Sequence, residues 1–158
     1  MKYQKLGSAP LNESCGPAPL KRLNFTVPGE ARAKARPQVR AFGGRAQMYK
    51  DTVTATFENW VRLHAEAALG TQSRFEGAVA ISIQVITEPA KSHSDKKRKE
   101  MIDGRIKPTK YPDLDNVIKS VIDGCCRVAI RDDVLVVEIT ASKSYGAQAA
   151  TLVSIHEV

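Results

Sequence analysis

The chain has 158 residues, of which 42% are hydrophobic, and a formal net charge of +7 at pH 7. This length suits one globular domain with a modest core, and the positive charge favours a polyanionic partner such as nucleic acid over an anionic membrane surface. No apolar run approaches the roughly 20 residues of a spanning helix, and residues 1–20 lack the apolar centre of a secretory signal. We therefore expect a cytoplasmic protein without a membrane partner.

The N-terminal half contains few regular elements. Residues 1–21 mix Pro, Gly, Ser and Asn without a hydrophobic period, and we expect a flexible extension before a domain at 22–158. Residues 22–27 predict a short strand, and 30–47 predict a basic loop. Apolar residues then recur at helical spacing over 50–69, which predicts a helix that ends before a glycine.

The C-terminal half has clearer periodicity. Residues 75–88 alternate apolar and polar side chains, as in a half-buried strand. A short charged helix is predicted over 92–104, capped by one of its serines and ended by its glycine. Residues 134–142 and 149–158 predict two further strands, which we expect to form an antiparallel hairpin.

The stretch YPDLDNVIKSVIDG, residues 111–124, predicts an amphipathic helix. Its apolar side chains share one arc: Leu114, Val117, Ile118, Val121, Ile122 and Cys125. Its polar side chains take the other: Asn116, Lys119, Ser120 and Asp123. Pro112 favours an extended entry, so we expect Asp113 just before the helix and Asp115 in its first turn.

The charges along the chain are segregated. Lysine and arginine dominate residues 21–50 and 91–110, whereas acidic residues outnumber basic ones over 113–138. Basic side chains bind DNA phosphates, but carboxylates repel a phosphodiester unless a divalent cation lies between them. Magnesium prefers such hard oxygen ligands. The acidic centre therefore predicts a bound divalent metal, with Asp132 and Asp133 as a second source of carboxylates beside Asp113 and Asp115.

Each part of this pattern has a simpler interpretation. Basic runs are often solvated faces, and an aspartate before a helix is commonly a cap. Asp115 and Lys119 could form a surface ion pair of little consequence, and Asp132 and Asp133 could belong to a turn. The three cysteines and three histidines show no metal-ligand spacing, so no zinc site is expected.

The residues resemble the RusA family of Holliday junction resolvases, which are crossover junction endodeoxyribonucleases. The family signature, a DLDN…K…D helix followed by a DD strand entry, reads here PDLDNVIKSVIDGCCRVAIRDDVLVVEITASKSYG. Upstream, VPGEARAKARPQ is similar to the family pattern G-x-x-x-x-K-x-R-P, and KSHSDKKRKEMIDG looks like a basic segment of phage-type members. Two departures are DDVLV, where many members have Ser-Gln after the aspartates, and DGCC in place of DAL.

The resemblance implies a single α+β domain with a mixed sheet packed against helices, a homodimer, and magnesium-dependent cleavage of four-way DNA junctions in recombination and repair, with manganese as a substitute. Matching positions imply the catalytic carboxylates and metal ligands Asp113, Asp115 and Asp133, and the catalytic lysine Lys119. Supporting roles are implied for Asn116, Asp123 and Asp132. The DNA-binding side chains would be Lys34, Arg36, Lys96, Lys97, Arg98, Lys99 and Lys110.

The chemistry expected from this resemblance is metal-assisted phosphodiester hydrolysis, which leaves the 3′-oxygen as the departing group. Lys119 would stabilise the developing charge or orient the water, and binding should weaken steeply with salt. Two alternatives stay open at this point. One is a nucleic-acid-binding module without hydrolysis, and the other is a nuclease that cuts flaps or replication forks.

Overall fold

A four-stranded mixed sheet forms the centre of the fold in the computed structural model, which describes residues 21–32, 38–42, 45–49 and 52–158. The strand order is β1-β6-β4-β5; β6 pairs antiparallel with both β1 and β4, whereas β4 and β5 run parallel. The strands are β1 (Arg22–Pro28), β4 (Val79–Thr87), β5 (Val136–Tyr145) and β6 (Ala150–Glu157). The predicted α+β class with a mixed sheet is confirmed.

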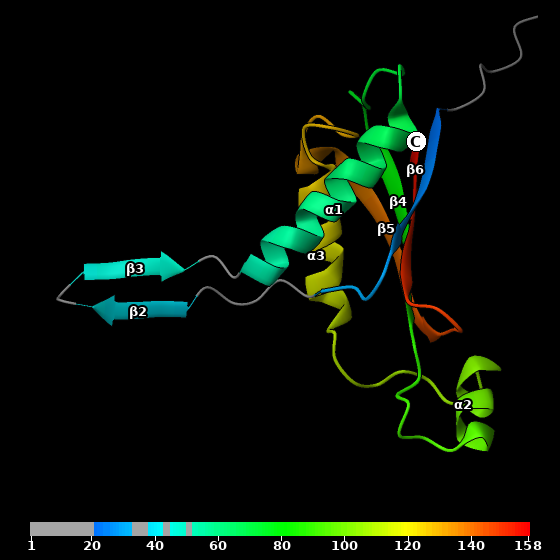
Figure 1. Ribbon diagram of the computed structural model, residues 1–158. Coiled ribbons are helices and arrows are strands. Elements are labelled where there is room, and N and C mark those ends of the chain that lie inside the picture. Colours follow the sequence, from blue (N-terminus) through cyan, green and yellow to red (C-terminus); the bar gives the residue numbers. More distant parts are fainter. Residues whose placement is uncertain (1–20, 33–37, 43–44, 50–51) are drawn as a thin grey trace, which may run out of the picture.

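Two helices cover one face of this sheet, as Figure 1 shows: α1 (Thr52–Leu69) and α3 (Leu114–Cys125). A third helix, α2 (Asp95–Ile102), lies beyond one end of the sheet in the long connection from β4 to α3. Among the described helices, none is both long and apolar enough to cross a membrane. The predictions of all three helices are confirmed, including a serine cap on α2, where Ser94 accepts a hydrogen bond from the backbone N–H of Lys97.

The core lies between the helices and the sheet. Along β1 every second side chain is buried, which is the period of a strand with one covered face. The same face of β4 and β6 contributes further buried residues, and buried side chains of α1 and α3 complete the cluster. The largest fully buried side chains include Phe75, Ile81, Ile83, Ile130 and Ile155.

The predicted hairpin between the last two strands is wrong. β4 lies between β5 and β6, because the chain returns through α3 and lays β5 parallel to β4. The glycine turn after β5 does exist, but it passes around the end of β4, where the N–H of Gly146 donates to the carbonyl of Thr87 at 3.0 Å. Alternating hydrophobicity identifies a strand without identifying its partner.

The predicted basic loop is also wrong in part, because it contains the antiparallel strands β2 (Gln38–Phe42) and β3 (Arg45–Tyr49). The sequence does carry a hairpin signal here. Short alternating segments flank the two glycines at positions 43–44, which is the composition of a two-residue hairpin loop. High charge favours a solvated loop, but the alternation in this region indicates the two strands more directly.

The buried face of α3 differs from the predicted arc at one position. Ser120, expected on the wet side, is fully buried, and its hydroxyl donates to the carbonyl of Asn116 at 3.2 Å. A serine can occupy such a site because its hydroxyl finds a partner within its own helix. Gly124 is buried as well, and a Cβ there would lie 2.7 Å from the Cβ of Val61. The two helices therefore approach most closely where this glycine has no side chain.

We expect Gly124→Ala to lower the free energy of unfolding by about 1–3 kcal/mol, because the added methyl group would also meet the carbonyl oxygen of Glu58 at 2.8 Å. Urea denaturation would measure the change. Gly77→Ala is the matched control, since a Cβ at Gly77 meets nothing within 4 Å. Equal midpoints for the two variants would contradict the close packing of α1 on α3.

Candidate active site

Asp113 and Asp115 lie where α3 begins. Asp113 is the N-cap residue with extended backbone angles, φ −69° and ψ 128°, and Asp115 is in the first turn. Both are exposed. The side chain of Asp113 makes no capping hydrogen bond, so a purely capping role is not supported. The backbone placement predicted from Pro112 is confirmed, and both carboxylates are accessible to a ligand.

Lys119 follows Asp115 by one helical turn and is exposed. Within the part of the chain that the structure describes, neither side chain forms an ion pair, so the simple surface-pair interpretation is not supported. Asn116 and Asp123 are both partly buried on the same helix. This polar side of α3 thus offers a free ammonium group near the two carboxylates.

Asp132 and Asp133 lie just before β5, in and beside the short 3₁₀ turn Asp133–Leu135. Hydrogen bonding to the Asp133 side chain and to the N–H of Val134 lowers the pKa of Asp132. Burial, followed by the charges of Asp133, Asp123 and Asp132, raises the pKa of the Cys126 thiol to about 11. The N–H of Ile130 also donates to the carbonyl of Cys125 at 3.2 Å, which holds the segment before Asp132 at the C-terminal end of α3.

The two acidic groups therefore lie at opposite ends of α3. The helix has 12 residues and spans about 18 Å, and Figure 1 shows its first residues at the end of the sheet near α2 and its last residues at the other end. No group of three His, Cys, Asp or Glu side chains within the described ranges is placed to hold a metal ion. The expected convergence of Asp113 and Asp115 with Asp133 is not found within one chain. Their catalytic and metal-binding roles stay predictions.

The basic helix α2 lies at the same end of the sheet as the start of α3 (Figure 1). Lys96, Lys97 and Lys99 are exposed, whereas Arg98 is partly buried and pairs with Asp95 at 3.8 Å. Lys110, in the connection to α3, is exposed too. Lys34 and Arg36 lie outside the described residues. A basic helix thus lies at the same end of the sheet as the start of α3, and DNA binding by these residues stays a prediction.

Lys143, near the end of β5, is a residue that the sequence interpretation missed. Its ammonium group donates to the carbonyl of Lys110 at 2.7 Å and to that of Pro112 at 3.0 Å. It therefore contacts the turn that leads directly into Asp113. The signal in the sequence is weak, because a single lysine in a strand of small and apolar residues reads as an ordinary edge residue.

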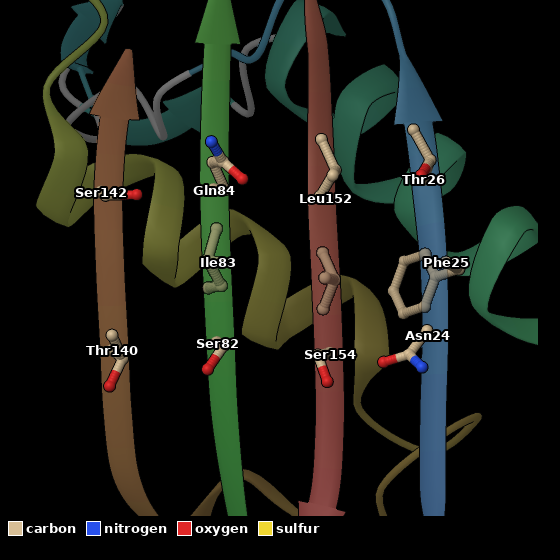
Figure 2. Close-up of a pocket in the computed structure, with 11 residues that line it drawn as sticks. Asn24, Phe25, Thr26, Ser82, Ile83, Gln84, Thr140, Ser142, Leu152 and Ser154 are labelled. Atoms are coloured by element: carbon tan, nitrogen blue, oxygen red, sulfur yellow. The ribbon is translucent and has the colours of Figure 1, made fainter.

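The other face of the sheet carries a shallow pocket of about 510 Å³ (Figure 2). Its lining side chains come from all four strands and are uncharged, among them Asn24, Thr26, Ser82, Gln84, Thr140 and Ser154. Such a surface offers no group that titrates near neutral pH and no carboxylate for a cation. The chemistry is therefore assigned to the ends of α3 and not to this pocket.

Comparison with known proteins identifies the family of the chain. The family model described as Endodeoxyribonuclease RusA matches residues 28–156. The chain is also 33% identical over 138 residues to the uncharacterized protein YqaN of Bacillus subtilis (strain 168), a match that covers 86% of this chain and 96% of YqaN. The region matched by the family model contains α2, α3 and the turn before β5, together with β4, β5 and nearly all of β6, whereas β1 lies before it except for its last residue. The chain belongs to the RusA family of endodeoxyribonucleases.

Proposed function

We propose that the protein is a structure-selective endonuclease that resolves four-way DNA junctions by magnesium-dependent hydrolysis, giving paired symmetric nicks in recombination and repair. The observation that carries the proposal is the exposed carboxylate of Asp113, free of any capping bond at the start of α3, which lies at the same end of the sheet as the basic helix α2. Family membership supports nuclease chemistry, and the basic surface supports a phosphate backbone as the ligand.

The chain's own side chains would divide the work. Lysines of α2 would contact backbone phosphates and position the strand, and Lys119 would stabilise the charge that develops on the attacked phosphate. Carboxylate oxygens suit magnesium, which would supply charge neutralisation and an activated water when bound. Since one chain leaves the three aspartates divided between the two ends of α3, we assign no step to the metal within a single chain.

A homodimer would resolve this division. β5 is an edge strand of the sheet, and hydrophobic side chains in and before it are exposed: Val134 at 75%, Val137 at 63% and Ile139 at 46%. A long apolar edge strand invites pairing with another chain. In an antiparallel pair related by a two-fold axis, the beginning of one β5 lies opposite the end of the other.

Such pairing would bring the carboxylates together. Asp133 immediately precedes the beginning of β5, and Lys143 ties the end of β5 to the turn before Asp113. Asp133 of the partner subunit would therefore approach Asp113 and Asp115. The symmetry would create two such sites, which matches the two related strands that a resolvase cuts in a four-way junction.

The direct test is cleavage of a labelled mobile four-way junction with and without magnesium, with both nicks mapped. We expect symmetric nicks in magnesium and none in its absence, and slower cleavage of linear duplex at equal salt. A preference for forks or flaps would instead identify a nuclease of the same chemistry with a different substrate. Preference for linear duplex would reject the junction assignment.

A DNA-binding module without hydrolysis is the second candidate. The separation of the acidic groups within one chain favours it. This candidate predicts a gel shift with the junction but no nicking at any magnesium or manganese concentration, so the same experiment distinguishes the two.

A further inference from the structure

We infer that Lys143 is a positioning residue that fixes the turn presenting Asp113 to the substrate. This inference rests on the proposed function, because the role of the turn depends on Asp113 acting in hydrolysis. Lys143 lies in β5, outside the residues that are expected to bind DNA.

Lys143 binds the turn before α3 at two carbonyl groups, one on each side of a single residue. Its ammonium group donates to the carbonyl of Lys110 at 2.7 Å and to that of Pro112 at 3.0 Å, and Tyr111 lies between these two acceptors in the chain. Hydrogen bonds from a charged donor are stronger than those between neutral groups. The two bonds join positions 31 and 33 residues apart in the sequence and so link the end of β5 to the entry of α3.

The position of Asp113 depends on this link. Its carboxylate has no capping hydrogen bond, so the region that this side chain can reach depends on where the backbone places residue 113. On its other side the carbonyl of Asp113 accepts the N–H of Val117 at 3.1 Å, which fixes the start of the helix. Lys143 and α3 thus hold the two sides of Asp113, and loss of either would move the carboxylate.

The electrostatics argue against a role in helix stability alone. The positive end of the helix dipole lies at the start of α3, where a nearby cation is unfavourable. A neutral side chain would avoid that repulsion. Here Lys143 is partly buried, and its ammonium group donates to the carbonyl of Pro112, the residue directly before Asp113. The charge of Lys143 is therefore better explained by the turn that it binds than by the stability of the helix.

The test compares Lys143→Met, which removes both bonds and the charge, with Lys143→Arg, which keeps a cationic donor. We expect the methionine variant to lower the single-turnover nicking rate about 10- to 100-fold, while its junction affinity changes less than about 3-fold. The arginine variant should recover most of the rate. Amide hydrogen exchange at Val117, whose N–H donates to the carbonyl of Asp113, should become faster in Lys143→Met without DNA.

Lys21→Met is the matched control. The Lys21 ammonium group also donates to a backbone carbonyl, that of Ser73, but at a place in the fold remote from α2 and the start of α3. Its loss should affect stability and leave nicking unchanged. Equal rate losses in the two methionine variants, or a loss of affinity that accounts for the loss of rate in Lys143→Met, would overturn the inference.

The hydrogen-exchange arm separates this inference from the proposed function. If the wild-type protein nicks no branched DNA, the proposed function fails, and unchanged exchange at Val117 would then overturn the positioning role as well. Faster exchange confined to the first turn of α3 would support the link from Lys143 even in that case.

Discussion

Asp113→Asn is expected to abolish nicking of a four-way junction while the variant still binds that junction. The substitution removes a carboxylate charge at nearly constant volume, and an amide is neither an anionic metal ligand nor a base. We expect the single-turnover rate to fall by at least about 10²- to 10³-fold, the range seen when one stabilising group of an active site is removed. Gel shifts and nicking rates measured on the same preparation would show the separation of binding from cleavage.

Asp113→Asn should leave the start of α3 undisturbed. Asparagine is as good an N-cap residue as aspartate, and the Asp113 side chain makes no capping bond that could be lost. Asp95→Asn is the matched control, because Asp95 is likewise an exposed acidic residue where a helix begins. If Asp113→Asn nicks the junction at the rate of the control, the assignment of Asp113 to the chemistry is wrong.

The sequence predicted the start of α3 well because the signals there are local. Pro112 restricts its neighbour's backbone, and the apolar period of α3 sets the face that is buried. Ser120 escaped this reasoning, since a hydroxyl bonded to the carbonyl one turn earlier can be buried at little cost. Local patterns report backbone geometry more directly than the satisfaction of each polar group.

The position of Asp133 could not be predicted in the same way. It depends on the direction in which α3 carries the chain and on the choice of β4 as the partner of β5, both of which are decided by packing across the whole domain. The predicted convergence of the three acidic residues took no account of the length of the segment between them. Helix α3 lies between them in the chain, and its length separates Asp113 from Asp133.

This separation leads to the second large prediction. Asp113→Asn and Asp133→Asn should each be inactive alone, but subunits of the two variants, mixed so that dimers exchange, should recover nicking. In the mixed dimer one site would contain both substitutions, and the other would combine an intact Asp113 with an intact Asp133. With random exchange about one quarter of all sites would be intact, because about half of the dimers are mixed and each has one such site.

The cleavage products of the mixed dimer provide a second test beside its nicking rate. With a single intact site, it should nick one strand of the junction and leave the symmetric strand uncut. Asp113→Asn mixed with Asp115→Asn is the control. These two residues lie at the same end of α3, so every site in that mixed dimer contains one substitution and no recovery is expected. If mixed dimers of Asp113→Asn and Asp133→Asn form and remain inactive, the three carboxylates do not act across a two-fold interface, and pairing of β5 edges is not the basis of the active enzyme.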